Sequence, residues 1–314
     1  MQAPSVRYLC CLVILLVMGC EQQSGSAGAV PLESEPRLVR LPYTSQADGA
    51  EREFFVYLPR GYENHPGRKW PLLLFLHGNG ERGNGRDELD FTLVHGPLYE
   101  AWIQKRDLPF IIVVPQLHMF GMDEKVPYIA DRSREQIPQR LADGVPERLY
   151  MGARGEMGPG KEVAGWEERP IGLPLGWDRV ETDLVQMLDQ VASGYRVDKR
   201  RVYLTGLSYG GFGSWYMASR YPQRFAAVAP VAGWGHPDLM PSIADNSLPV
   251  WAFAGGRDRV VDKSDFYAGI NRLEELGGDV RFTLHEDMPH DVWVRVYAGE
   301  DLYRWLLAQS LDRR

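Results

Sequence analysis

The segment 206–210, Gly-Leu-Ser-Tyr-Gly, places a serine between glycines, directly after one apolar run and just before another. Residues 201–205 predict a short buried strand, and residues 212–220 predict a helix. A sharp turn between the two would hold Ser208 in a strained backbone with its hydroxyl exposed, and the flanking glycines would relieve the crowding. The pattern therefore predicts a nucleophilic serine. A glycine-bearing turn with a capping serine is the alternative.

A serine hydroxyl is a weak nucleophile at neutral pH, so it needs a base to take its proton and an acid to orient that base. In one recurring order of this triad, the acid and then the histidine follow the serine along the chain. Asp258 lies in the loop after the strand-like run 250–254 and is the predicted acid. Asp262 and Asp265 lie closer to the next predicted helix, where a capping role suits them better.

Two histidines follow Asp258 in the chain. His285 falls on the second face of the alternating strand predicted at residues 280–284, whereas His290 lies in the loop beyond that strand. A loop position lets a base reach both serine and acid, so we predict His290 as the base. The other histidines precede this region and are interpreted as structural or pocket-lining residues: His65, His77, His95, His118 and His236.

An acyl-transfer site also needs two backbone N–H groups directed at the negative oxygen that forms during the reaction. Tyr209, immediately after the serine, predicts the first donor. The second should come from residues 77–80, His-Gly-Asn-Gly, because they follow the apolar run 72–76 and glycines let the backbone approach a substrate closely. Within this segment we favour Asn79 over Gly78.

Strand-like and helix-like segments alternate through the body of the chain. Continuous apolar runs, which indicate strands buried on both faces, occupy residues 71–76, 110–114, 202–205, 226–229 and 250–254. Helical periodicity covers residues 180–191, 266–276 and 301–311. Apolar and polar residues alternate at 38–41 and at 52–58, with Gly49 between the two segments. This pattern predicts an antiparallel hairpin at a sheet edge. The predicted fold class is α/β, a mostly parallel twisted sheet with helices on both faces.

Residues 117 to about 176 do not fit this alternation, because Gly, Pro and Met are scattered there among charges. The stretch is far longer than the roughly 12–15 residues at which a plain loop becomes uncommon. It is either an irregular surface excursion or a lid or substrate wall. The second reading follows from its origin at the carboxyl end of a central strand, where open α/β sheets bind ligands.

The N-terminal residues resemble the export signal of a bacterial lipoprotein. Arg7 precedes an apolar run, residues 9–18, that is too short for a permanent bilayer span. The run ends Val-Met-Gly-Cys at residues 17–20, which resembles a lipobox and predicts cleavage before Cys20 and lipidation of its thiol. An uncleaved signal anchor and a plain secretory signal are the alternatives.

The remaining composition agrees with an exported protein. All three cysteines, Cys10, Cys11 and Cys20, fall in this segment, so no disulfide framework is expected. Glu21 rather than Asp after the cysteine implies, by the same resemblance, the outer membrane, facing the periplasm or the cell surface. The predicted organisation is a signal peptide (1–19), a lipidated tether (20–35) and one domain (36–314) with the 117–176 insert. A net charge of −7 without a basic run argues against a nucleic-acid partner.

The ordered set of motifs resembles the α/β-hydrolase superfamily. More narrowly, it resembles the esterase group with polyhydroxybutyrate-depolymerase-like and feruloyl-esterase-like enzymes and the "predicted peptidase" lipoproteins. The motifs are Tyr-Leu-Pro-Arg-Gly-Tyr at 57–62, His-Gly-Asn-Gly-Glu-Arg-Gly at 77–83, residues 206–213, and the Asp258 and His290 loops. Two positions depart from the group: Tyr209 stands where Met is usual, and Pro289 where Gly is usual.

The resemblance implies an α/β-hydrolase fold that cleaves small-molecule or polymer-borne carboxylic esters through an acyl-enzyme. Ser208, His290 and Asp258 would form the triad, Tyr209 and Asn79 would supply the oxyanion hole, and no metal or organic cofactor is implied. A serine peptidase would share every catalytic part, and a non-catalytic surface-binding lipoprotein could use the same fold. These two readings are the alternatives to the esterase.

Overall fold

A computed structural model describes residues 33–148, 152–157, 160–161 and 163–314. The predicted signal peptide, Cys20 and most of the predicted tether lie outside the described residues. Within the described part of the chain, no helix is both long and apolar enough to cross a lipid bilayer.

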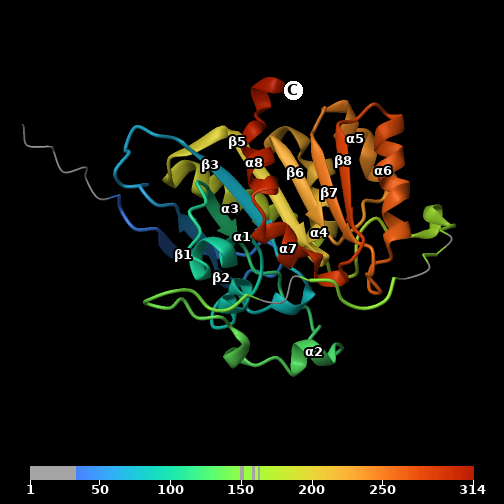
Figure 1. The fold of residues 1–314 in the computed structure, drawn as a ribbon. Helices are drawn as coiled ribbons and strands as arrows, with labels where there is room; N and C mark the ends of the chain where they lie inside the picture. Colours follow the sequence, from blue (N-terminus) through green and yellow to red (C-terminus); the bar gives the residue numbers. More distant parts are fainter. Residues whose placement is uncertain (1–32, 149–151, 158–159, 162) are drawn as a thin grey trace, which may run out of the picture. The chain divides into compact units, whose positions relative to one another are not determined.

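Eight strands form one sheet in the order β1-β2-β4-β3-β5-β6-β7-β8 (Figure 1). The strands are β1 Arg37–Thr44, β2 Glu51–Leu58, β3 Trp70–Leu76, β4 Ile111–Val114, β5 Val197–Leu207, β6 Ala227–Val231, β7 Val250–Gly255 and β8 Val280–His285. β2 pairs antiparallel with both β1 and β4, and the other pairs are parallel. The predicted mostly parallel sheet with an antiparallel hairpin at its edge is confirmed.

Alternate residues of the central strands pack on opposite faces of the sheet, because successive side chains of a strand point to opposite sides. On β3, Leu72 and Leu74 belong to a core layer with α3, α4, α5 and α6. Leu73 and Phe75 belong to a second layer with α1, α7 and α8. Burial on both faces explains why these strands have continuous apolar sequences.

The helices are α1 Gly96–Leu98, α2 Pro127–Ala130, α3 Glu181–Gly194, α4 Tyr209–Arg220, α5 Met240–Asp245, α6 Phe266–Glu275, α7 Trp293–Ala298 and α8 Asp301–Ala308. α3, α4 and α6 lie where the periodicity predicts helices. α8 ends at Ala308, short of the predicted residue 311, because the chain becomes extended at Gln309 and then forms a separate 3₁₀ turn, Leu311–Arg313.

The insert has little regular structure, as its sequence indicates. Its described residues contain only α2 and two 3₁₀ turns, Arg134–Gln136 and Trp166–Glu168. Figure 1 shows this segment, in green, extending along the end of the sheet at which α4 begins. Hydrogen bonds to distant residues hold the insert along this path, such as that from Arg169 to Asp265.

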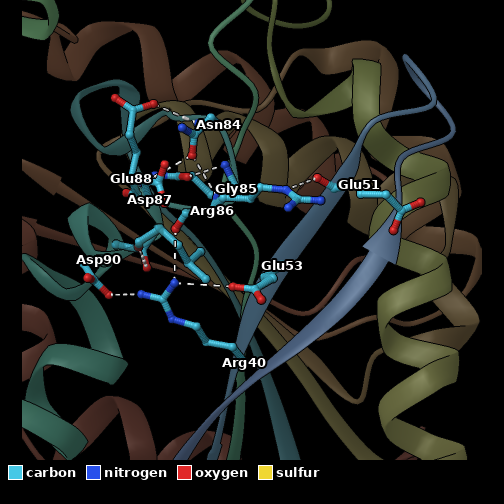
Figure 2. Close-up of polar contacts among 12 residues, drawn as sticks. Arg40, Glu51, Glu53, Asn84, Gly85, Arg86, Asp87, Glu88 and Asp90 are labelled. Carbon is cyan, nitrogen blue, oxygen red and sulfur yellow. Dashed lines mark hydrogen bonds and ion pairs between the residues drawn. The ribbon is translucent and has the colours of Figure 1, made fainter.

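The edge hairpin supports the segment that follows the predicted oxyanion loop. Figure 2 shows Arg40 of β1 extending to residues 86–90, where Nη2 pairs with Asp90 at 2.5 Å and Nη1 donates to the Arg86 carbonyl at 3.1 Å. Nη1 also lies 3.4 Å from the Glu53 carboxylate of β2. The hairpin thus fixes the chain shortly after residues 77–80, at the carboxyl end of β3.

Candidate active site

Ser208 occupies the turn between β5 and α4 with φ 50° and ψ −116°. A positive φ is strained for any residue with a Cβ, and such strain of about 1–3 kcal/mol persists only where the surroundings enforce it. The Ser208 N–H donates to the Val231 carbonyl of β6 at 2.9 Å, and the Ser208 carbonyl accepts from Phe212 N–H at 3.1 Å. The backbone is therefore held on both sides while the residue remains partly exposed.

The flanking glycines are required by contact distances. A Cβ on Gly210 would lie 1.8 Å from the Leu76 carbonyl oxygen at the end of β3. A Cβ on Gly206 would lie 2.3 Å from the Gly210 carbonyl oxygen. No side chain fits at either position, so the turn can pack directly against the neighbouring strand only with glycine.

The structure brings together the three side chains predicted as a triad. The Nδ1 of His290 lies 2.7 Å from Oδ2 of Asp258, and its Nε2 lies 3.0 Å from Oγ of Ser208. A carboxylate can only accept, so Asp258 selects the imidazole tautomer with hydrogen on Nδ1. That tautomer leaves the Nε2 lone pair facing the serine hydroxyl, which is the arrangement a general base requires.

Asp258 is a fully satisfied buried carboxylate. Its side chain is 0% exposed, and its second oxygen, Oδ1, accepts from the backbone N–H groups of Val260 and Val261 at 2.8 and 2.9 Å. The two competing aspartates have other partners: Asp262 caps the turn Lys263–Asp265 by accepting from Ser264 N–H, and Asp265 pairs with Arg169.

Backbone contacts join the acid and histidine loops. Gly256 N–H donates to the carbonyl of His285, the alternative base, which lies at the end of β8, and Arg257 N–H donates to the Met288 carbonyl. A Cβ on Gly255 would lie 2.3 Å from the Pro289 carbonyl oxygen. The close approach of these loops sets the short distance between the acid and the base.

His77 holds the predicted oxyanion loop from behind. Its Nε2 accepts from the Leu117 N–H at 2.9 Å, so Nδ1 carries the hydrogen and donates to the Gly78 carbonyl at 2.6 Å. Burial lowers the pKa of His77 to about 3, which keeps the ring neutral. In a trans peptide, N–H and C=O point in opposite directions, so the Asn79 N–H is turned away from His77.

The loop itself runs beside the nucleophile. A Cβ on Gly78 would lie 3.6 Å from the Cβ of Ser208. Within the described chain, neither the Asn79 N–H nor the Tyr209 N–H is bonded to an acceptor. The Gly78 N–H instead interacts with the Glu81 carboxyl group. Asn79 therefore stays the predicted second donor.

Glu81 is a buried carboxyl group for which the sequence predicts no role. Its Oε2 lies 3.9 Å from Nδ1 of His77, and its Oε1 lies 3.8 Å from Nε2 of His95. Burial raises the pKa of Glu81 to about 7 and lowers the pKa of His95 to about 4. Both imidazoles are therefore neutral at pH 7, and these contacts are not ion pairs.

The insert contacts three loops at this end of the sheet. Its described residues include Arg132, which donates to the Gly80 carbonyl at 3.2 Å, and Arg154, whose N–H donates to the Asp287 carbonyl beside the histidine loop. Further along, Trp166 packs edge-to-face against Trp234, which follows β6, at 5.0 Å. The insert therefore borders the oxyanion, histidine and β6 loops, as a substrate wall would.

Glu81 and Arg82 belong to the motif at residues 77–83, for which the sequence predicts a function of the backbone only. The signal that could have revealed them is two charged residues directly after a buried strand and a glycine-rich turn. Tyr128 of α2 was also missed, and its hydroxyl accepts from the Asn79 side-chain amide at 2.7 Å. No local pattern marks Tyr128 within an aperiodic segment.

Parts of this chain are similar to known proteins. The model of the prolyl oligopeptidase family matches residues 176–276. Poly(3-hydroxyalkanoate) depolymerase C of Paucimonas lemoignei is 48% identical over 48 residues, 15% of this chain and 12% of the relative. The bifunctional acetylxylan esterase/xylanase XynS20E of Neocallimastix patriciarum is 33% identical over 78 residues, 24% of this chain and 11% of the relative. The chain thus spans only a small part of the curated relatives it matches.

A crystal structure of a thermostable esterase superposes with a TM-score of 0.59 at 24% identity, over 87% of this chain and 63% of that one. This likeness shows the α/β-hydrolase fold. It therefore confirms the fold that the motifs imply, and the chain order of Ser208, Asp258 and His290 is one that recurs on this fold.

The protonation of Glu81 should make stability depend on pH. Its pKa is raised to about 7 from a value of 4.5, so the stability associated with the protonated form is complete below pH 4.5 and is lost as the pH rises through 7. We expect the free energy of unfolding of wild type to fall, relative to Glu81→Gln, between about pH 5 and pH 8. Urea denaturation across this range measures it. The exposed control Glu124→Gln should run parallel to wild type, and a parallel Glu81→Gln profile would contradict the prediction.

Proposed function

We propose that this protein is a serine hydrolase that cleaves carboxylic esters through an acyl-enzyme intermediate. The observation that carries the proposal is the continuous hydrogen-bonded relay from Ser208 Oγ through His290 to the buried Asp258 carboxylate. The relay occurs at a strained strand-to-helix turn, which is the position that exposes a nucleophile on this fold. A protein that used the fold only for binding would have no need for this relay.

In the proposed mechanism, Ser208 Oγ attacks the ester carbonyl carbon while His290 Nε2 takes the hydroxyl proton. The carbonyl oxygen becomes an anion that accepts from the N–H groups of Tyr209 and Asn79. Collapse of the tetrahedral intermediate breaks the bond to the alcohol, and His290 returns the proton to that oxygen. Water then attacks the acyl-enzyme by the same route and releases the acid.

The proposed substrates are small-molecule or polymer-borne esters. The names of the two curated relatives indicate a polyester and an acetylated polysaccharide as their substrates, and both contain esters of carboxylic acids. The His290 side chain is 19% exposed and Ser208 is partly exposed, so an ester on a larger molecule can reach them. The insert along three loops of the site is the structure that would select among acyl groups.

A serine peptidase is the second candidate, because the prolyl oligopeptidase family model matches residues 176–276. This range contains Ser208 and Asp258, the residues that both activities share, and it ends before His290. The match therefore supports the nucleophile and its acid but does not distinguish between the two leaving groups.

We also propose that the protein is exported and anchored to the outer membrane through a lipid on Cys20, facing the periplasm or the cell surface. The support is in the sequence: a short apolar run at residues 9–18 followed by Val-Met-Gly-Cys, with Glu21 next. The Ser-, Gly- and Ala-rich residues after Cys20 would serve as a flexible tether between lipid and enzyme.

Replacing the nucleophile should abolish activity. We expect Ser208→Ala to lower kcat for a short-chain p-nitrophenyl ester by at least about 10⁴-fold, since loss of one triad member removes the covalent route. Labelling by a fluorophosphonate probe should disappear as well. Ser193→Ala, an exposed serine on α3, is the matched control and should retain both properties. Equal labelling of wild type and Ser208→Ala would refute the proposed nucleophile.

The type of bond that the enzyme cleaves can be tested with two chromogenic substrates that share one acyl group. We expect the p-nitrophenyl ester to be hydrolysed and the corresponding p-nitroanilide to be a poor substrate, measured as kcat/KM for purified mature protein. Because the acyl group is constant, the comparison isolates the bond that breaks. Cleavage of the anilide with a similar kcat/KM would establish the peptidase instead.

Lipidation should depend on one cysteine. In cells fed a labelled fatty acid, we expect label on the wild-type protein and none on Cys20→Ser, because the acyl chains would be carried by that residue. Cys11→Ser, a change within the predicted signal peptide, is the control and should remain labelled. An intact N-terminus by mass spectrometry would indicate a signal anchor, and unlabelled protein cleaved elsewhere would indicate plain secretion. Either outcome contradicts the lipid anchor.

A further inference from the structure

We propose that Arg82 is a positioning residue that joins the two oxyanion-donor residues to both ends of the insert. This inference rests on the proposed function and concerns the same site. If this is so, the insert is part of the catalytic framework, because its carbonyl groups help to bind Arg82, and Arg82 holds the oxyanion loop in place.

Arg82 is 0% exposed, although it carries a charge. Burial of a charged group is costly unless its hydrogen-bonding groups are satisfied. Desolvation lowers the pKa of Arg82 to about 10, which leaves it charged at neutral pH. A buried arginine directly after the oxyanion loop therefore depends on specific partners to keep its position.

Two of its partners are the residues that carry the proposed N–H donors. The Nε of Arg82 donates to Oδ1 of Asn79 at 2.5 Å, and the guanidinium carbon lies 4.9 Å from the centroid of the Tyr209 ring. A guanidinium over an aromatic face is a favourable cation–π contact. One side chain thus touches residues on both sides of the position where the oxyanion would form.

The two other partners are the ends of the insert. The Nη1 of Arg82 donates to the His118 carbonyl at 2.9 Å, and its Nη2 donates to the Leu175 carbonyl at 2.7 Å. His118 lies near the start of the insert and Leu175 near its end, so one planar group binds both parts. A lysine could not replace this arrangement, because an ammonium lacks the rigid fork that serves three acceptors at once.

The insert also holds the oxyanion loop from the opposite direction. Arg132 donates to the carbonyls of Gly80 and Arg82, and its Nη2 pairs with Glu88 at 2.5 Å. The Asn79 amide donates to the hydroxyl of Tyr128, whose side chain is otherwise well exposed. The loop is therefore fixed by groups of the insert on one side and by Arg82 on the other.

The test is Arg82→Met, which keeps side-chain length but removes every donor. We expect kcat for the p-nitrophenyl ester to fall about 10²-fold, the scale of one misplaced oxyanion donor, with little change in KM. Affinity for a trifluoromethyl ketone should fall in parallel with kcat/KM, because its tetrahedral adduct places an oxyanion in the same position. Arg82→Lys should show nearly the same loss.

Arg106→Met is the matched control. Arg106 also donates to two backbone carbonyls, those of Tyr297 and Gly299, and lies 5.3 Å from the Tyr303 ring centroid, but it does not contact the oxyanion loop. This variant should lose thermal stability while kcat and ketone affinity stay at the wild-type level. A purely structural role for Arg82 would make the two variants alike.

Wild-type kcat and ketone affinity in folded Arg82→Met, or a loss confined to KM, would overturn the inference. If that variant does not fold, Asn79→Ala removes the acceptor of Arg82 Nε while keeping the backbone N–H, and it should lower kcat and ketone affinity together. Unchanged values in folded Asn79→Ala would then overturn the inference. Failure of the proposed function is distinct, because wild type itself would then neither hydrolyse the ester nor bind the ketone.

Discussion

The lack of space around Ser208 is the constraint on which the rest of the site depends. A Cβ on Gly210 would lie 1.8 Å from the Leu76 carbonyl oxygen, and one on Gly78 would lie 2.7 Å from Leu207 Cδ1. The nucleophile turn thus packs on the backbone at the end of β3, and the oxyanion loop packs on the Leu207 side chain. The positive φ of Ser208 is enforced by this packing, because relaxation would move the turn into one of its neighbours.

Of the two cations at the oxyanion loop, Arg132 is paired with the Glu88 carboxylate, whereas Arg82 donates to neutral acceptors. His77 and His95 are neutral through burial, and Glu81 is about half protonated near pH 7. Arg82 and Arg132 remain as cations bonded to the loop or beside it. In a region with little water, fixed positive charge favours the oxyanion that forms in acyl transfer.

The sequence was sufficient for those features that depend on local pattern. Strands buried on both faces have continuous apolar runs, and the Ser208 turn needs its glycines, so both features could be predicted from the sequence alone. The choice of Asp258 over Asp262 followed from distance to the next helix start. α5 was not predicted, because it is short and carries Pro241 in its first turn.

The path of the insert could not be predicted for a different physical reason. Its position depends on hydrogen bonds to residues far away in the chain, such as Arg82 to the Leu175 carbonyl and Arg169 to Asp265. Such contacts leave no periodicity in a sequence. The role of the Arg82 side chain could not be predicted for the same reason. Its motif predicts only a function of the backbone, whereas the side chain contacts Asn79, Tyr209 and the insert.

One position at which the chain departs from the group it resembles, Tyr209, meets the insert at this arginine. Tyr209 replaces the usual Met after the nucleophile, and its ring lies under the Arg82 guanidinium. The long insert supplies the His118 and Leu175 carbonyls that accept from the other edge of the same group. A thioether would offer that cation no aromatic face, so Tyr209 and the insert both contribute to holding a buried charge. The departure at Tyr209 and the path of the insert therefore have one physical explanation, and it lies beside the oxyanion loop.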